Sequence, residues 1–395
     1  MDPICQTDFS AKEPSLGYNY QIRYSLYLLL RERAKANPSM RLEDLDDIVI
    51  EDADCKNLYQ TKLHINSVAN LSDRSTDFWK TIRIWSEAIL ATLLDVDSTV
   101  FTLITTATTS PDSFIYKLTI NSSQNRIGVI EDMLQICTER SNQTNIKGYE
   151  AFCRLSTEQQ TKLVNSIYII DASLSIDGTL SAIKNELIYS APIGKLDLFV
   201  EKIEGWWFQQ CILVLSQKKD CISGKELQMK ISDTREMFFA DNLPDDFPDP
   251  LTIDENEIAN YEERIFIKQL RLISLRNNSL RNAISDFRRA FEQRSKWLRD
   301  NLTGIDEYNR FDKLLYDYWN QIFALMKDDC QEMTEDELRK AGKSFYEEYY
   351  IKRTPACKIR NNFQPQYLTT GSCHMLADDK KIGWHPNFHE LLNDR

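Results

Sequence analysis

A segment rich in proline and aspartate, residues 241–250, divides the sequence into two parts. It reads Asp-Asn-Leu-Pro-Asp-Asp-Phe-Pro-Asp-Pro, a composition that favours irregular chain over helix or strand. A chain of 395 residues is long enough for two or three domains with real cores. We therefore predict one domain over residues 1–220, a linker over 221–252 and a second domain over 253–395.

The composition is typical of a helix-rich soluble protein. Hydrophobic residues make up 42% of the chain and charged residues 27%, and the eleven glycines and eleven prolines are few for this length. No apolar run is long enough to span a membrane, and the first residues lack the features of a secretory signal. The nine cysteines include no C-x-x-C pair, which fits reduced thiols. We expect a cytoplasmic protein that does not contact a membrane.

The net charge of −12 argues against a simple nucleic-acid-binding protein, because such proteins are usually basic. A nuclease is not excluded by this charge. A local basic groove is enough to bind DNA, and a basic partner can also bring the DNA to an acidic chain.

The first domain shows the alternation of helices and strands that is typical of an α/β fold. An apolar stripe predicts a helix over residues 17–36, and β-branched runs predict strands at 48–50, 57–65 and 100–106. Between the last two strands we expect a helix whose apolar face is formed by Phe78, Ile82, Trp85 and Ile89.

The two strands at 48–50 and 57–65 carry the residues that most resemble a reaction site. Side chains alternate along a strand, so Gln60, Lys62 and His64 are expected on one face, opposite the carboxylates of Asp46 and Asp47. Carboxylate and amide oxygens suit Mg²⁺, and a lysine ammonium can orient water or stabilise charge on a phosphate. This is the layout of an Asp…(Asp/Glu/Gln)-x-Lys nuclease site.

The second domain is predicted to be mainly helical, with helices within 253–302 and over 306–327 and 334–351. Thr334 with Glu337 three residues later forms a capping box. The first stretch carries a run of basic residues that has two readings: a solvated face paired with acidic residues, or a face for a partner or DNA. The run comprises Arg281, Arg288, Arg289, Arg294, Lys296 and Arg299.

The tail, residues 355–389, is rich in Asn, Gly and Pro and is expected to form an ordered loop. This loop would dock on a partner or on the preceding helices. The tail also holds Cys373, His374, His385 and His389, so a structural Zn²⁺ is an alternative, although the paired cysteines of familiar zinc modules are missing.

Residues 15–220 resemble the nuclease domain of bacterial anti-phage effectors, which also occurs on the endonucleases of cyclic-oligonucleotide (CBASS) defence. The resemblance rests on Gly17-Tyr18-x-Tyr20-Gln21, Glu43-x-x-Asp46-Asp47, Tyr59-Gln60-Thr61-Lys62-Leu63-His64, Leu71-Ser72-Asp73-Arg74-Ser75-x-Asp77-Phe78-Trp79-Lys80-Thr81 and Ile104-Thr105-Thr106-Ala107. It implies a restriction-endonuclease-like α/β core of the PD-(D/E)xK type, followed by a mainly α-helical C-terminal domain.

The second part of the chain is similar to the C-terminal domain of ABC-three-component defence systems. The similarity rests on Phe287-Arg288-Arg289-Ala290-Phe291-Glu292-Gln293-Arg294-Ser295-x-Trp297, Gly371-Ser372-x-His374-Met375-Leu376-Ala377-Asp378 and Ile382-Gly383-Trp384-His385-Pro386. Together the two halves resemble the nuclease effector of the Lamassu anti-phage and anti-plasmid system. The resemblance implies an SMC-like ATPase subunit and a small third subunit as partners.

Carried onto this sequence, the nuclease motif implies four catalytic residues. Asp47 is the expected metal-binding carboxylate with Asp46 beside it, Gln60 is the second metal ligand, and Lys62 is the catalytic lysine. The metal would be Mg²⁺ or Mn²⁺. The commonest form of the motif has Glu or Asp where this chain has Gln60, which removes a negative charge and weakens metal binding.

Three further residues are expected to support the site. Glu43 and Gln21 belong to the layer around the metal ligands, and His64 is expected as a supporting or phosphate-contacting group rather than a base.

Three functions compete at this stage. The leading hypothesis is a metal-dependent endonuclease that cleaves double-stranded DNA, with a homo-oligomer as the active form because cutting both strands needs two sites. The second is an adaptor whose nuclease fold is inactive, which the neutral Gln60 and the acidic charge favour. The third, a DNA-binding regulator, is disfavoured by the charge.

Overall fold

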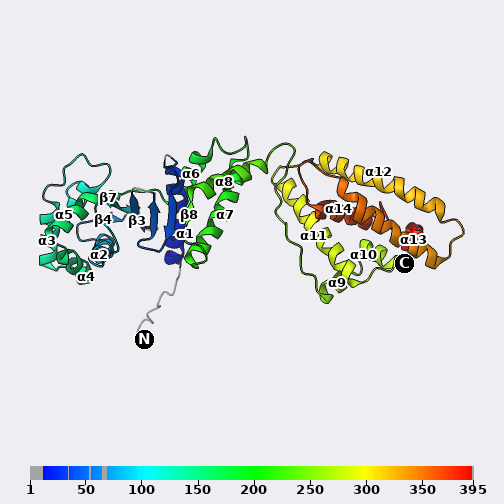
Figure 1. Cartoon of the computed structure of the whole chain (residues 1–395), viewed down its shortest axis with the longest axis horizontal. Coiled ribbons are helices and arrows are strands. Elements are labelled where there is room, and N and C mark those ends of the chain that lie inside the picture. The colour runs from blue at the N-terminus through cyan, green and yellow to red at the C-terminus, as the bar shows by residue number, and fades with distance from the viewer. Residues whose placement is uncertain (1–11, 34, 53–54, 65–68, 394–395) are drawn as a thin grey trace, which may run out of the picture. The chain divides into compact units, whose positions relative to one another are not determined.

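The computed structural model describes residues 12–33, 35–52, 55–64 and 69–393. The chain forms two compact units, Met1–Arg235 and Glu236–Arg395, which we call the N-terminal and C-terminal units (Figure 1). Among the described helices, none has the length and apolar character needed to cross a bilayer.

The N-terminal unit is built on a six-stranded mixed sheet with the strand order β7-β5-β3-β2-β1-β8. Strands β3, β5 and β7 are parallel to one another, whereas β2 is antiparallel to β3, and β1 is antiparallel to both β2 and β8. The strands are β1 (Ser39–Leu42), β2 (Ile48–Glu51), β3 (Lys56–Lys62), β5 (Thr99–Thr105), β7 (Ile167–Ile170) and β8 (Ile222–Ser223), with a separate two-stranded sheet of β4 (Asn70–Leu71) and β6 (Thr108–Thr109).

Helices surround this sheet (Figure 1). Two hydrogen bonds hold helix α1 in place. The hydroxyl of Tyr24 in α1 lies 3.0 Å from the Ser173 hydroxyl, and the indole of Trp207 in α7 donates to the Ile22 carbonyl of α1 over 3.0 Å. The helices are α1 (Lys12–Arg31), α2 (Thr76–Leu90), α3 (Val129–Glu139), α4 (Ile146–Arg154), α5 (Thr157–Ser166), α6 (Ile176–Leu187), α7 (Leu196–Leu215) and α8 (Gly224–Glu236), with 3₁₀ turns η1 (Phe114–Leu118) and η2 (Gln143–Asn145).

The core of the N-terminal unit joins β2, β3 and β5 to helix α2. Val49 and Leu58, which are paired across β2 and β3, belong to the same buried cluster as Phe78 and Trp85 of α2. The predicted apolar face of this helix is confirmed, because all four of its residues are buried. This packing holds α2 against the strands that carry the predicted site.

The expected linker, residues 221–252, differs from what the structure shows. Its first part is folded into the N-terminal unit, where β8 adds to the sheet edge beside β1 and leads directly into α8. The pairing of Ile222 with Met40 explains this, since both side chains are completely buried. The part of the predicted linker up to Glu236 is therefore regular structure, a short strand followed by a helix.

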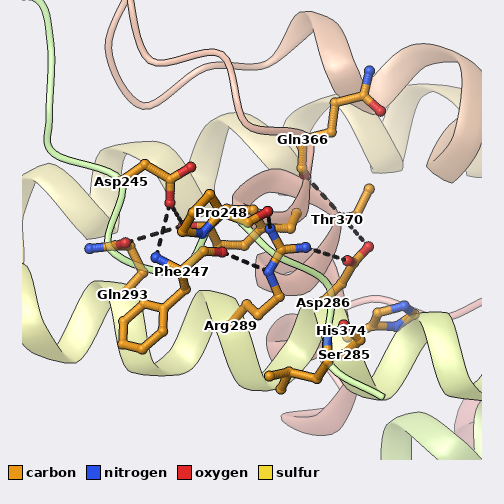
Figure 2. A network of polar contacts seen from close by, with 12 residues as sticks. Asp245, Phe247, Pro248, Ser285, Asp286, Arg289, Gln293, Gln366, Thr370 and His374 are labelled. Carbon is orange, nitrogen blue, oxygen red and sulfur yellow. Dashed lines mark hydrogen bonds and ion pairs between the residues drawn. The ribbon is translucent and has the colours of Figure 1, made fainter. Parts of the chain in front are cut away.

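The segment 241–250 is irregular, as predicted, but it is bound along helix α11 of the C-terminal unit (Figure 2). Arg289 donates from Nε to the Phe247 carbonyl over 2.8 Å and from Nη2 to the Pro248 carbonyl over 2.7 Å. The Gln293 side chain accepts from the Asp246 amide and donates to the Asp246 carboxylate. These bonds satisfy backbone groups that proline-rich chain cannot pair with itself.

The C-terminal unit is helical, and its core is formed by large aromatic side chains such as Trp297, Tyr349 and Trp384. The predicted capping box of Thr334 and Glu337 is present. Its elements are α9 (Glu255–Tyr261), α10 (Ile265–Leu272), α11 (Asn277–Arg299), α12 (Ile305–Asp329), α13 (Glu335–Tyr346), a π-helix η3 (Glu347–Arg353), a 3₁₀ turn η4 (Thr354–Ala356), α14 (Gln366–Asp378) and α15 (Phe388–Asn393).

The prediction of a loop over residues 355–389 is wrong, because this stretch contains the buried helix α14. Ten of its residues are buried on all sides, so the sequence shows no amphipathic period there. Gly371 allows α14 to lie directly against α11: a Cβ at this position would lie 2.1 Å from the Asp286 carbonyl oxygen and 2.5 Å from the Ala290 Cβ.

Candidate functional site

The predicted site lies where β2 begins and β3 ends. Ile48 pairs with Tyr59 in the antiparallel register, so Asp47, which immediately precedes β2, comes opposite Gln60. Strand β3 lies inside the sheet, between β2 and β5, and Lys62 is its last residue. The sheet thus brings Asp47, Gln60 and Lys62 to one end of a central strand.

Asp47 is held by the residue between the two predicted partners. Its Oδ2 accepts hydrogen bonds from both the backbone amide and the hydroxyl of Thr61, each at 2.8 Å. The expectation that its carboxylate faces Gln60 and Lys62 is therefore incomplete. Because Asp47 lies before the strand and not in it, its side chain can turn toward the neighbouring backbone.

Gln60 has a buried oxygen without a partner. The residue is 3% exposed, and no described group donates a hydrogen bond to its Oε1. A buried acceptor left unpaired costs about 1–3 kcal/mol, which is tolerated where a ligand or a water completes the site. This oxygen is the clearest sign of a ligand position on β3.

Asp46 is buried beside Asp47 and is bound by helix α2. The indole of Trp85 donates to its Oδ2 over 2.6 Å, and the Asp47 amide donates to its Oδ1 over 3.0 Å. Burial, together with the Asp47 charge, raises the pKa of Asp46 to about 7, although the hydrogen bonds from Trp85 and the Asp47 amide and the Lys62 charge oppose the rise. Asp46 and Lys62 are therefore close enough to interact electrostatically.

Gln21 and Glu43, which were predicted to lie around the metal ligands, both contact the backbone of Asp47. The side-chain amide of Gln21 donates to the Glu43 carboxylate over 3.0 Å and to the Asp47 carbonyl over 2.6 Å. The Glu43 amide also donates to the Asp47 carbonyl, and the positive φ of 50° at Glu43 allows the chain to close this turn. Helix α1 thus fixes the backbone of the predicted metal ligand.

His64 lies beyond the end of β3, so strand alternation no longer sets its direction. Its Nε2 lies 3.0 Å from Oδ2 of Asp77, which is in the first turn of α2. Thr61, Trp85 and Asp77 are thus three residues that sequence reasoning missed. The sequence contained one signal for two of these residues: Asp77 and Trp85 lie eight positions apart on the same predicted helix.

The donor set fits a magnesium ion in part. Asp47 and Gln60 supply hard oxygen ligands, and the unpaired Oε1 of Gln60 is an observation that favours a ligand there. Within the described ranges, no group of three or more His, Cys, Asp or Glu residues is arranged to hold a metal. Mg²⁺ commonly binds through one or two carboxylates and completes its shell with water and substrate phosphate.

Cys373, His374 and His385 of the tail are buried among protein groups, whereas His389 is exposed. Nε2 of His374 lies 2.8 Å from the Tyr350 hydroxyl, and the Nδ1 of His385 accepts from the Asn387 amide. Cys373 lies in α14 with its thiol 3.8 Å from the Tyr349 hydroxyl. No zinc cluster is formed by the residues that the structure describes.

Most of the basic run of α11 is paired with acidic groups, although part of it is buried. Arg281 and Arg288 pair with Glu255 and Glu257 at the surface. Arg294 is 8% exposed and binds both carboxylate oxygens of Asp312 at 2.9 Å. These arginines stabilise the C-terminal unit, so they offer little free charge for DNA.

Residues 266–392 match the family model described as C-terminal domain 7 of the ABC-three component (ABC-3C) systems. The C-terminal unit is therefore similar to a domain of the ABC-three component systems. This match covers about a third of the chain, and it supports membership in a multi-component defence system with partner subunits. A comparison with curated proteins gives no match.

Among solved structures, the chain is similar to two receptors described as Cap4 SAVED/CARF-domain containing. The Moraxella osloensis receptor is 15% identical with a TM-score of 0.35, and the match covers 69% of this chain and 60% of that one. The Acinetobacter baumannii receptor is 13% identical with a TM-score of 0.32, over 69% and 60% of the two chains. This chain thus spans about 60% of their length, and these TM-scores are too low to assign a function.

Proposed function

We propose that the N-terminal unit is a metal-dependent DNA endonuclease of the PD-(D/E)xK type and that the chain is the effector of an ABC-three-component defence complex. The observation that carries this proposal is the buried, unpartnered Oε1 of Gln60 on the strand that ends in Lys62, opposite Asp47. The family match of the C-terminal unit supports a role inside such a complex.

Each residue of the site has a separate role in this proposal. Asp47 and Gln60 would hold an Mg²⁺ or Mn²⁺ ion, which when bound would supply Lewis-acid stabilisation of charge on the phosphate. Lys62 is half-buried at the end of β3, where its ammonium orients the attacking water or stabilises the phosphate charge. Gln21 and Thr61 fix the backbone and the carboxylate of Asp47.

The C-terminal unit serves complex assembly in this proposal. Its partners are an SMC-like ATPase and a small third subunit, as the resemblance of the sequence implies. Double-stranded DNA is the substrate, and a homo-oligomer provides the two sites needed to cut both strands. The net charge of −12 agrees with a resting chain that binds DNA weakly before activation.

A second candidate function, an inactive adaptor, is favoured by two observations. Thr61 already donates two hydrogen bonds to Oδ2 of Asp47, and Gln60 adds no charge to the site. Mn²⁺ titration of the full chain separates the two functions. If the site binds metal, Gln60→Glu should bind Mn²⁺ more tightly than wild type, and Asp47→Asn should bind it more weakly. If the chain is an inactive adaptor, neither wild type nor either variant should bind Mn²⁺.

The endonuclease activity is tested by Lys62→Ala in the full chain co-expressed with its partner subunits. Plasmid cleavage in Mg²⁺ should be lost, while the complex still assembles. Lys56→Ala is a matched control, because Lys56 opens the same strand and contacts Glu51 at 3.6 Å, away from the site. Equal cleavage by the Lys62→Ala and wild-type complexes would overturn the site assignment.

A further inference from the structure

His64 and Asp77 form a pair that the nuclease motif does not include. Nε2 of His64 lies 3.0 Å from the Asp77 carboxylate, and both side chains are partly accessible, with 33% and 26% exposed. His64 follows Lys62 by two residues at the site end of β3. A titratable side chain that is held by a carboxylate and open to solvent is suited to proton transfer.

The backbone of His64 is held in place by the next strand. Its amide donates to the Thr106 hydroxyl over 2.8 Å, and the Thr106 amide in turn donates to the Lys62 carbonyl over 3.2 Å. Thr106 follows directly after β5, which pairs with β3 in parallel up to Lys62 and Thr105. One residue therefore fixes Lys62 and His64 relative to each other.

Helix α2 connects this pair to the acidic end of the site. Asp77 and Trp85 are eight positions apart on α2, about 12 Å along the helix axis. Asp77 holds His64, and Trp85 holds Asp46, whose charge interacts with Lys62. The same helix thus holds both His64 and Asp46.

The position of Asp77 determines which nitrogen of His64 is available. A carboxylate next to Nε2 favours the proton on that nitrogen, because a lone pair there would face a negative charge. Nδ1 then carries the lone pair, and no described group binds it. A histidine with this tautomer can accept a proton, as in nucleophile–base–carboxylate arrangements of other hydrolases.

We propose that His64 is the general base of the phosphodiester hydrolysis and that Asp77 is its positioning residue; this inference rests on the proposed endonuclease function. The oxygen of a water molecule attacks phosphorus and forms a new P–O bond, while one of its protons moves to Nδ1 of His64. The bond from phosphorus to the leaving sugar oxygen breaks, and that oxygen takes its electron pair and then a proton from solvent. His64 releases the accepted proton to solvent before the next turnover.

The tautomer is tested without any activity. In the metal-free full chain with ¹⁵N-labelled histidine, the His64 ring should show its proton on Nε2 at pH 8. Asp77→Asn should change the tautomer populations, whereas Asp97→Asn, which removes a carboxylate paired with Lys162 elsewhere, should not. A His64 ring with its proton on Nδ1 in wild type would overturn the proposal.

The role of His64 is tested by single-turnover DNA cleavage in the activated complex. His64→Gln should lower the cleavage rate about 10²–10⁴-fold and should make the rate less dependent on pH than in wild type. Asp77→Asn should lower the rate at least about 10-fold with unchanged DNA affinity. Mn²⁺ affinity should stay at the wild-type value in both variants, since neither residue is a metal ligand here.

The outcomes separate this inference from the proposed function. If wild type cleaves DNA in a Lys62-dependent way and His64→Gln cleaves equally well, the general-base role is wrong and the endonuclease stands. If His64→Gln keeps its rate at saturating DNA but binds DNA more weakly, His64 is a phosphate contact, which also overturns the base. If no activated wild-type complex cleaves DNA, the endonuclease itself fails.

Discussion

The indole N–H of Trp85 donates to the carboxylate of Asp46 over 2.6 Å, and this bond joins helix α2 to the residue beside the proposed metal ligand. Among the residues that the structure describes, it is one of two hydrogen bonds to a carboxylate that is almost completely buried. Two hydrogen bonds do not offset the burial, so the pKa of Asp46 is about 7.

Asp46→Asn should therefore change how stability depends on pH in metal-free protein. Native Asp46 keeps its proton up to about pH 7, whereas an unfolded aspartate loses it near pH 3.9, so wild-type stability falls between these values as pH rises. Asn keeps an acceptor for Trp85 and cannot ionise. We expect the variant to be roughly 2–4 kcal/mol more stable than wild type at pH 8.5, and similar to it at pH 4.

Hydrogen exchange of the β2 and β3 amides in the presence of a chelator measures this difference. Asp97→Asn is the control, because Asp97 is largely exposed and pairs with Lys162 at the surface. An Asp46→Asn effect of equal size at both pH values would show that Asp46 is ionised throughout.

Gly371→Ala should destabilise the C-terminal unit by about 2 kcal/mol or more, because the new methyl group would overlap the Asp286 carbonyl and the Ala290 side chain. Gly205→Ala is the matched control. Gly205 is also inside a helix, but nothing lies within 4 Å of the added Cβ, so the same exchange there should be neutral or stabilising. Thermal unfolding of the full chain measures both. A harmless Gly371→Ala would contradict the close approach of α11 and α14.

The regular elements around the site could be predicted from the sequence because their signals are local. The β-branched residues 48–50 form β2, the alternating Thr and apolar residues after Val100 lie in β5, and Trp85 lies on the predicted apolar face of α2. Helix α14 could not be predicted in this way. It is buried on all sides, so it has neither an amphipathic period nor a charged face.

For the site itself, the sequence could predict which residues lie near one another but not which side chains form hydrogen bonds. Strand register brings Asp47 opposite Gln60, but alternation cannot show that Asp47 turns toward Thr61. The contacts of Asp46 with Trp85 and of His64 with Asp77 join residues far apart in the sequence. They depend on how α2 packs across the sheet, which composition and periodicity do not contain.

Arg289→Ala should release the 241–250 segment from helix α11. Arg289 is 6% exposed and donates to the carbonyls of Phe247 and Pro248, so its loss leaves two acceptors unpaired and costs about 2–3 kcal/mol. Arg288→Ala is the control. Arg288 is the neighbour of Arg289 and pairs with Glu257 near the surface, so it should contribute less than about 1 kcal/mol to stability. Faster hydrogen exchange in residues 245–251 of Arg289→Ala alone is the expected result. Equal exchange in the two variants would show that the segment is held by other contacts.

His374 should make the C-terminal unit sensitive to acid. Burial lowers the pKa of His374 to about 3, whereas a histidine in the unfolded chain titrates near 6.5. Below pH 6.5 the unfolded state therefore binds more protons, and the unit should lose up to about 1.4 kcal/mol of stability for each pH unit down to about pH 3.

The variant His374→Gln should reduce this slope, because glutamine does not titrate at the position facing the Tyr350 hydroxyl. Part of the slope should remain, since burial also lowers the pKa of His385. His389→Gln is the control, because His389 is exposed and its replacement should leave the slope unchanged. Hydrogen exchange of the α14 amides in the full chain, compared at pH 7 and pH 5, measures the effect. If stability depends on pH equally in His374→Gln and wild type, then His374 in the folded protein titrates near the ordinary histidine pKa.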